Sequence, residues 1–215
     1  MIIAHDVINI GNDRAQLARM SKLAKETLDV ETLDVVADRG YFDGEEIKAC
    51  VEAGITVTLP KPQTSGSRAE GRFVKQDFAY LPEKDAYRCP AGEQLTRRYT
   101  SVEHGMDLHV YWTTACLACP LKSQCTTGTE RRIKRWEHEA VIDAMQQRLD
   151  RAPNIRRQTV EHPFGTIKSW MGATHFLTRS LGKVRTEMSL HVLAYNLKRV
   201  IAILGAAPLM EAMRA

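Results

Sequence analysis

TLDVVADRGYFDGEEIKACVEAGITVTLP, residues 32–60, decides the fold class of this chain. It opens with an apolar, β-branched run that ends at Asp38 and predicts a buried strand. The letters DGEE that begin at Asp43 are typical of a capping box, so a helix should begin there and end at Gly54. The run ITVTLP then predicts a second strand. Strand, helix and strand in succession indicate an α/β fold.

Further elements are expected on both sides of this stretch. Residues 1–9 alternate between apolar and polar types and predict a strand, and residues 12–28 carry apolar side chains at helical spacing. Helical periodicity returns over residues 136–150 and in a long final helix over about 183–204. The inward positions expected on this last helix are Val184, Met188, His191, Tyr195, Val200 and Ile201.

A block of different composition separates these two parts. It begins with the turn-forming stretch KPQTSGSRAEG, residues 61–71, and continues with short β-type segments over residues 73–114. We interpret the block as an insertion into an α/β core. The predicted domains are therefore an N-terminal core part, residues 1–60, an insertion, residues 61–130, and a helical C-terminal core part, residues 131–215.

Four of the five cysteines lie in the expected insertion, with the spacing C-x26-C-x2-C-x5-C. They are Cys89, Cys116, Cys119 and Cys125. A tetrahedral zinc site needs four such ligands, and a CxxC turn supplies two of them from one short loop. The insertion has few large apolar residues, so we expect a structural Zn²⁺ to stabilise it. His104 or His109 could replace one ligand. The alternative is four reduced cysteines in a small β module.

Composition favours an ordinary globular protein, with 44% hydrophobic and 26% charged residues. The short N-terminal apolar run does not resemble a signal peptide, and no uncharged stretch approaches the length of a membrane span. We therefore expect a cytoplasmic protein with no membrane partner, in a reducing compartment that disfavours disulfides. The fifth cysteine, Cys50, should be a buried small hydrophobic residue on the predicted helix.

The charge is unevenly distributed. Residues 1–130 hold 15 Lys/Arg and 19 Asp/Glu, a balance of −4, whereas residues 131–215 hold 15 and 7, a balance of +8. A basic half suits a path for DNA phosphates, although many charged helix faces are simply solvated. Trp136 and Trp170 lie in this basic half and could stack on bases, or they could anchor the core.

The basic half contains the array Arg157-x3-Glu161-x6-Lys168, within RRQTVEHPFGTIKSW. Together with Asp38 at the end of a predicted strand, Glu161 would give a pair of carboxylates. Mg²⁺ prefers one or two carboxylates together with phosphate oxygens, and two such ions can stabilise both oxygens of an in-line displacement. Arg157 and Lys168 would bind the flanking DNA phosphates.

These motifs, in this order, resemble those of bacterial insertion-sequence transposases of the DDE type. Many members carry a Tyr where this chain has Asn154. The resemblance implies a ribonuclease H-like core with a cysteine-rich insertion, and metal-dependent cutting and joining of DNA. It also implies that Asp38 and Glu161 hold Mg²⁺ or Mn²⁺. The implied partners are double-stranded DNA, as transposon ends and target DNA, and a second copy or a full-length transposase.

The first acid of such a site has no clear counterpart in this chain. The family order places three strands and a helix between the strands of the first and second acids, so Asp6 lies too close to Asp38. We therefore expect an N-terminally truncated transposase that is inactive alone, with Asp6 as the alternative first acid. The chain could instead be a non-catalytic DNA-binding or regulatory remnant, a zinc-ribbon interaction module, or a nuclease of ribonuclease H type.

Overall fold

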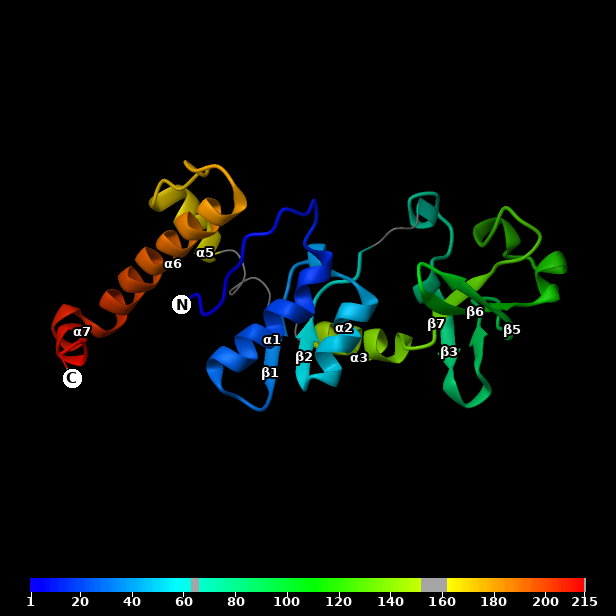
Figure 1. Ribbon diagram of the computed structural model, residues 1–215. Coiled ribbons are helices and arrows are strands. Elements are labelled where there is room, and N and C mark those ends of the chain that lie inside the picture. The colour runs from blue at the N-terminus through cyan, green and yellow to red at the C-terminus, as the bar shows by residue number, and fades with distance from the viewer. Residues whose placement is uncertain (63–65, 152–161, 215) are drawn as a thin grey trace. The chain divides into compact units, whose positions relative to one another are not determined.

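The computed structural model describes residues 1–62, 66–151 and 162–214 of the chain (Figure 1). The chain divides into two compact units, which we call the terminal unit and the central unit. They consist of Met1–Lys61 with Val141–Ala215, and of Pro62–Ala140, respectively. Both helices and sheets are present, so the expectation of a mixed α/β protein is confirmed at this level. The insertion boundaries and the ribonuclease H-like core stay predictions.

The predicted strand, helix and strand form the start of the terminal unit. Strands β1 (Leu33–Val36) and β2 (Ile55–Thr58) pair in parallel, with Leu33 opposite Ile55, and α2 (Gly44–Glu52) connects them (Figure 1). A parallel pair needs such a crossover, because the chain must return to the same end of the sheet. Apolar side chains from α2 and β2 are fully buried between these elements: Ile47, Cys50, Ile55, Val57 and Leu59.

The N-terminus of α2 is capped by Asp43 as the sequence predicts, but only one of the two hydrogen-bonding halves of the capping box forms. The Asp43 carboxylate accepts hydrogen bonds from the backbone N–H groups of Glu45 (3.0 Å) and Glu46 (3.2 Å). Glu46 does not complete the capping box. Its Oε2 instead accepts from the N–H of Ala18 (2.8 Å), which lies in α1 (Leu17–Leu28). This carboxylate therefore ties α1 to α2.

The strand predicted over residues 1–9 is wrong, because this segment, all of which is described, is not a strand and pairs with none of the described strands. Its backbone is held instead by side chains of α6 (Leu181–Leu204). The Ile2 N–H donates to Asn196 Oδ1 (2.8 Å), and Asn196 Nδ2 donates to the Ile2 carbonyl (2.7 Å). One amide side chain thus replaces the two hydrogen bonds that a neighbouring strand would supply.

The remaining helices of the terminal unit include the long final helix predicted from the sequence. Within the described residues they are α3 (Glu139–Arg151, which begins at the end of the central unit), α5 (His162–Gly165), α6 and α7 (Ala206–Ala212). On α6, Val192 and Tyr195 are buried, but Ile201 is 42% exposed, so its predicted inward position is wrong. Among the described residues no single helix is long and apolar enough to cross a membrane. Only α6 and α7 taken together pass that test, with a bend of 112° between them.

The central unit is a five-stranded antiparallel sheet in the order β3-β4-β5-β6-β7. Its strands are β3 (Ala79–Leu81), β4 (Ala86–Arg88), β5 (Gln94–Glu103), β6 (Met106–Trp112) and β7 (Ile133–Trp136). The β segments expected before residue 114 are therefore observed. The hydrophobic core of this unit is formed mainly by side chains of the strands themselves: Phe78, Tyr87, Leu95, Tyr111 and Ile133.

Two tyrosine hydroxyls beside this core share one carboxylate as their hydrogen-bond acceptor. Asp85 stands at a left-handed turn (φ 43°) and accepts hydrogen bonds from the hydroxyls of Tyr111 (2.6 Å) and Tyr80 (2.9 Å). The Tyr111 bond is the main cause that lowers the pKa of the Asp85 carboxyl, and burial partly opposes it. Burial, together with Asp85, raises the pKa of Tyr111. Tyr111 can be fully buried, and Tyr80 half-buried, because each hydroxyl has an acceptor.

Candidate functional site

Asp38 stands where the sequence predicts, just beyond the carboxyl end of β1. It is exposed and begins the turn Arg39–Tyr41, where its side chain accepts a hydrogen bond from the Gly40 N–H (3.3 Å). Ligands of open α/β sheets bind outside the carboxyl ends of parallel strands. The local structure therefore leaves this carboxylate on the edge of the sheet where a metal or a phosphate can approach it.

A second carboxylate near Asp38 was not predicted. Burial raises the pKa of the Tyr41 phenol, and the charges of Asp13 and Asp38 raise it further, so both carboxylates act on one hydroxyl. Asp13 precedes α1, and its side chain makes no capping hydrogen bond. In the sequence it resembles an ordinary helix cap, and no local signal distinguishes it from one.

A cavity of about 420 Å³ lies beside this acidic edge. Ala37 and Tyr41, on either side of Asp38, contribute to its wall. So do Pro163 and Phe164, which follow Glu161 in the sequence. The remaining wall comes mainly from residues 2–8, α1 and β1, with Met188 of α6. The cavity therefore joins the sequence neighbourhoods of the two predicted metal acids.

The other members of the predicted array are only partly visible. Glu161, Arg157 and Asn154 lie outside the described residues. Lys168 lies in the π-helical turn Thr166–Trp170 and is exposed, while the preceding Ile167 is buried. The buried Ile167 fixes the turn, so that the Lys168 side chain faces solvent and is accessible to a charged ligand.

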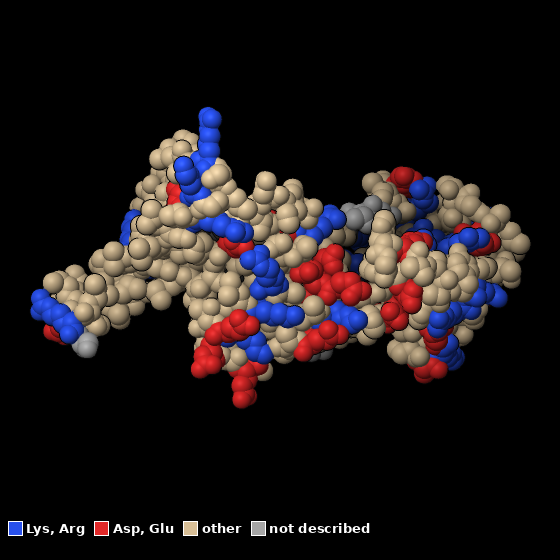
Figure 2. All heavy atoms as spheres, in the orientation of Figure 1, with Lys and Arg blue, Asp and Glu red and all other residues tan. Residues whose placement is uncertain are grey.

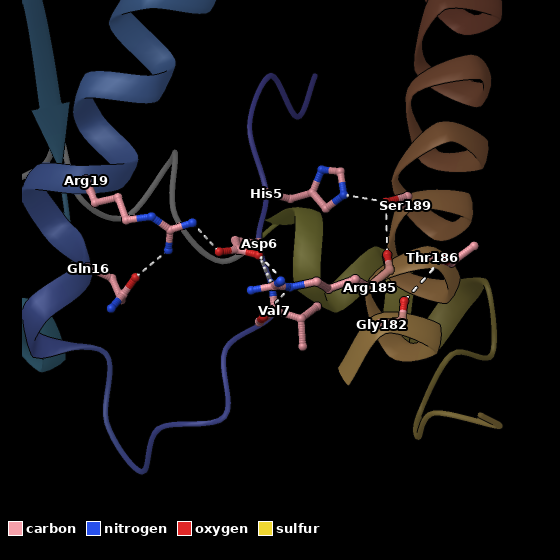
Figure 3. Close-up of polar contacts among 9 residues, drawn as sticks. All are labelled: His5, Asp6, Val7, Gln16, Arg19, Gly182, Arg185, Thr186 and Ser189. Atoms are coloured by element: carbon pink, nitrogen blue, oxygen red, sulfur yellow. Dashed lines mark hydrogen bonds and ion pairs between the residues drawn. The ribbon is translucent and has the colours of Figure 1, made fainter. Parts of the chain in front are cut away.

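Asp6, the alternative first acid, is bound between two guanidinium groups (Figure 3). Arg19 of α1 pairs with one carboxylate oxygen, and Arg185 of α6 lies 3.3 Å from the other while donating to the Val7 carbonyl (3.0 Å). The hydrogen bond from Arg19 is the largest cause that lowers the pKa of Asp6. This arrangement suits a residue that ties the N-terminal segment to α1 and α6, because a metal ion would have to displace both cations.

The four insertion cysteines come together in the central unit. Cys89, Cys116, Cys119 and Cys125 line one small cavity of about 20 Å³, beside Phe73 and Phe78. Burial raises the pKa of the Cys125 thiol; the Arg131 guanidinium lowers it, and the other three thiols raise it. All five cysteines are free, and Cys50 is fully buried as predicted.

The sulfur atoms are not preassembled as a metal site. Across the described part of the chain, no group of three or more His, Cys, Asp or Glu side chains is placed to hold a metal ion. His104 and His109, the predicted substitutes, do not line the cysteine cavity. The turns are nevertheless tight, since the N–H of Cys119 donates to the Cys116 carbonyl (3.4 Å).

The two tryptophans of the basic half differ in exposure. Trp136 is 4% exposed and packs in the central unit, as expected of a core anchor. Trp170, at the end of the π-helical turn, is 82% exposed, with the Lys198 ammonium 5.7 Å from the centre of its ring. On the face shown in Figure 2, Lys and Arg side chains gather over the chain around α5 and the start of α6.

A family model described as "Transposase DDE domain" matches residues 88–201, more than half of the chain. The matched region contains the four insertion cysteines and the Arg157, Glu161 and Lys168 array, whereas Asp38 lies before it. No curated protein matches this chain, and no solved structure does either. The assignment of Asp38 therefore depends on its place beyond the end of β1 and on the cavity that its neighbours Ala37 and Tyr41 line.

Proposed function

The chain belongs to the DDE transposase family, and we propose that it acts in the cutting and joining of insertion-sequence DNA by metal-dependent phosphodiester chemistry. DNA is the partner that this family implies in general. The finer assignment, an insertion sequence with its transposon ends and a target DNA, is part of the proposal. So is the cytoplasmic location, which the free cysteines support.

The observation that carries the proposal is the cavity of about 420 Å³ in the terminal unit. Its wall includes Ala37, directly before Asp38, Tyr41, three residues after it, and the two residues that come second and third after Glu161. Two acids distant in sequence can share a metal ion only if their chain segments meet in space. The cavity brings those segments together, which supports the pairing of Asp38 with Glu161.

In this proposal Asp38 and Glu161 hold Mg²⁺ or Mn²⁺. The donor chemistry fits, because carboxylate oxygens are the hard ligands that these ions prefer. When bound, the metal supplies charge stabilisation to phosphate oxygens and to the attacking and leaving oxygens. Arg157 and the exposed Lys168 bind the neighbouring phosphates and so fix the position of the DNA.

We further propose that the acids of this chain are two of the three that the family reaction needs. Asp6 is occupied by Arg19 and Arg185. Asp13 acts on the same tyrosine as Asp38 but stands at a 3-10 turn rather than on a strand beside β1. The chain alone should therefore bind DNA without joining it, and a full-length transposase would supply the missing acid.

Metal binding is the direct test. Titration of the purified chain with Mn²⁺, followed by electron paramagnetic resonance, should give an affinity that falls at least about tenfold in Asp38→Asn and in Glu161→Gln. Asp34→Asn, on the exposed side of β1, is the matched control and should leave the affinity unchanged. Equal Mn²⁺ affinity in all four proteins would sink the shared site.

A strand-transfer assay tests the catalytic part. The chain alone, with Mg²⁺ or Mn²⁺ and a transposon-end duplex, should give no joined product. Cleavage that disappears in Asp38→Asn would show that the chain contains a complete site. The alternative function is a non-catalytic DNA-binding or regulatory remnant. An assay with and without the full-length transposase separates the two, because a remnant changes only the partner's activity.

For the central unit we propose a structural Zn²⁺ held by Cys89, Cys116, Cys119 and Cys125. Four thiols around one small cavity are a donor set that zinc prefers, and each thiolate becomes easier to form beside the metal. Zinc would draw the sulfur atoms closer than they lie in the structure. Among the described residues, the core beside the cysteines contains only two aliphatic side chains, Leu95 and Ile133, in addition to its aromatic residues. Metal binding would therefore contribute much of the unit's folding stability.

Cobalt substitution tests this site. Co²⁺ bound by four thiolates absorbs strongly in the visible and near-ultraviolet, so the apo chain should bind one Co²⁺ with the tetrahedral thiolate spectrum. Cys116→Ser and Cys119→Ser should remove that spectrum, whereas Cys50→Ala, a change at a buried cysteine of the other unit, should keep it. A spectrum that survives the loss of Cys116 and Cys119 would exclude the four-cysteine site.

A further inference from the structure

Trp170 is unusually exposed for a side chain of its size. With 82% of its surface accessible, it is among the most exposed apolar side chains of the chain. Large aromatic side chains usually bury 150–250 Å² and stabilise a core or an interface when they do so. A tryptophan left open at the end of a short π-helical turn is instead available to a ligand.

The surroundings of this indole are cationic. The Lys198 ammonium of α6 lies 5.7 Å from the ring centre, within the range of a cation–π contact. Lys168 stands two residues earlier in the same turn and is also exposed. An exposed aromatic face with a lysine over it, and a second exposed lysine on the same turn, can bind single-stranded nucleic acid, because the ring stacks on a base and the cations bind backbone phosphates.

The other two tryptophans do not offer such a face. Trp136 is buried. Trp112 has two guanidinium groups near its ring centre, Arg132 at 5.1 Å and Arg98 at 5.5 Å, and Tyr99 packs edge-on against it at 5.7 Å. Three side chains of its own unit therefore already pack against this ring.

We propose that Trp170 stacks on an unpaired base of bound DNA, while Lys198 and Lys168 bind the phosphates next to that base. The inference rests on the proposed function, since it takes DNA as the partner. It adds that the site prefers DNA with an unpaired nucleotide over a fully paired duplex. The basic side chains that gather around α5 and the start of α6 would bind the adjoining duplex (Figure 2).

Binding of the full chain to three labelled DNAs tests the proposal. The first is a blunt duplex, the second has a short single-stranded overhang, and the third has the same overhang without bases. The wild-type chain should bind the overhang DNA about tenfold more tightly than either of the others, since a stacked base contributes about 1–3 kcal/mol. A 2-aminopurine in the overhang should lose fluorescence when it stacks on the indole.

Substitutions test whether the Trp170 indole causes the preference for the overhang. Trp170→Ala should abolish the preference for the overhang and the 2-aminopurine quenching, while Trp170→Phe keeps part of both. Leu177→Ala is the matched control: Leu177 is also 82% exposed but has no aromatic face, so its loss should change nothing. Lys198→Ala should weaken overhang binding severalfold, and Lys198→Arg should restore it.

The results separate this proposal from the proposed function. If duplex binding persists but the overhang preference is absent, or is unchanged in Trp170→Ala, the stacking role is wrong and the transposase assignment stands. If the chain binds none of the three DNAs at low salt, DNA as the partner fails as well. If instead Trp170→Ala abolishes self-association in sedimentation and leaves the overhang preference intact, the ring belongs to a protein interface and the proposal is overturned.

Discussion

The central and terminal units are built from the chain in two different ways. The central unit is one continuous stretch, Pro62–Ala140, whose neighbouring strands pair in sequence order around an aromatic core. The terminal unit joins two stretches that are distant in sequence. Among the described residues its sheet has two strands, and its longest helix, α6, leaves a row of apolar side chains exposed: Leu190, Leu193, Leu197, Ile201 and Leu204.

The difference follows from where each unit finds hydrogen-bond partners for its backbone and its polar side chains. In the central unit, each strand pairs with the strand that precedes or follows it in the sequence, and the hydroxyls of Tyr111 and Tyr80 donate to Asp85. In the terminal unit, the N-terminal segment depends on α6, more than 180 residues later, for its backbone hydrogen bonds. On the face shown in Figure 2, the C-terminal half of α6 is mostly uncharged. The central unit thus resembles a self-contained module, whereas the terminal unit carries the candidate DNA and metal residues on open edges.

Removal of bound zinc should give the largest difference in stability between the two units. If zinc holds the four cysteines, chelation should unfold the central unit, because structural zinc sites contribute about 10 kcal/mol of apparent folding free energy. Hydrogen exchange should then show lost protection in β5 and β6 and unchanged protection in α2. Equal loss in both units, or no loss in either, would contradict the distinction. A Cys116→Ser, Cys119→Ser double variant serves as the control and should not respond to the chelator.

A matched pair of leucine substitutions compares the two kinds of apolar surface. Leu95 of the central core is 1% exposed, so Leu95→Ala should lower the free energy of unfolding by about 3 kcal/mol. Leu190 of α6 is 61% exposed, and Leu190→Ala should change it by less than about 0.5 kcal/mol. Urea unfolding of each variant gives both values. A large loss in Leu190→Ala would mean that α6 is covered in solution.

The cap of α2 offers a smaller effect confined to the terminal unit. Asp43→Ala removes the acceptor for two backbone N–H groups and should cost about 1 kcal/mol. Hydrogen exchange at the start of α2 should rise accordingly, while the central unit is unaffected. Asp34→Ala removes the same charge from an exposed position on β1 and provides the comparison. If both variants lose equal protection in α2, charge rather than capping is responsible.

The smallest expected effect is the acid sensitivity of the central unit. Because the folded-state pKa of Asp85 lies below its ordinary value of 3.8, its contribution to stability is full above that pH. The contribution is lost as the pH falls through the lowered pKa. Its size should stay below about 1 kcal/mol, since the Asp85 side chain is partly exposed.

Unfolding of the central unit at about pH 6 and about pH 3 measures this effect. The wild type should lose slightly more stability on acidification than Asp85→Asn, which cannot titrate and still offers an oxygen to Tyr111 and Tyr80. Glu83→Gln, an exposed carboxylate close by in the chain, is the control. Identical pH dependence in the wild type and Asp85→Asn would remove Asp85 as the cause.

Much of the local structure was predictable because it depends on neighbours within a few residues. The β-branched run before Asp38, the cap at Asp43 and the positive φ of Gly54 (70°) each follow from local chemistry. The same holds for the helix that ends at Leu204. The spacing of the cysteines likewise predicted a cluster, and the structure brings all four to one cavity.

The predictions that failed concern partners distant in the chain. Residues 1–9 have the alternation of a strand, but a strand needs an edge to pair with, and the side chain of Asn196 takes that place. Asp6 was only the alternative first acid, and no local pattern shows that Arg19 and Arg185 pair with it. The exposure of Ile201 also could not be deduced from helical spacing, which places a residue on a face without showing what covers that face.

By itself the sequence determined the strand–helix–strand start, the cysteine-bearing block and the acid–base array of a DDE transposase, because propensity, capping and spacing act over short distances. The tertiary structure alone decided that Asp13 shares a tyrosine with Asp38, and that Trp170 is open while Trp136 is buried. Such relations arise from the packing of segments far apart in the chain, and no local pattern encodes which distant surfaces will meet.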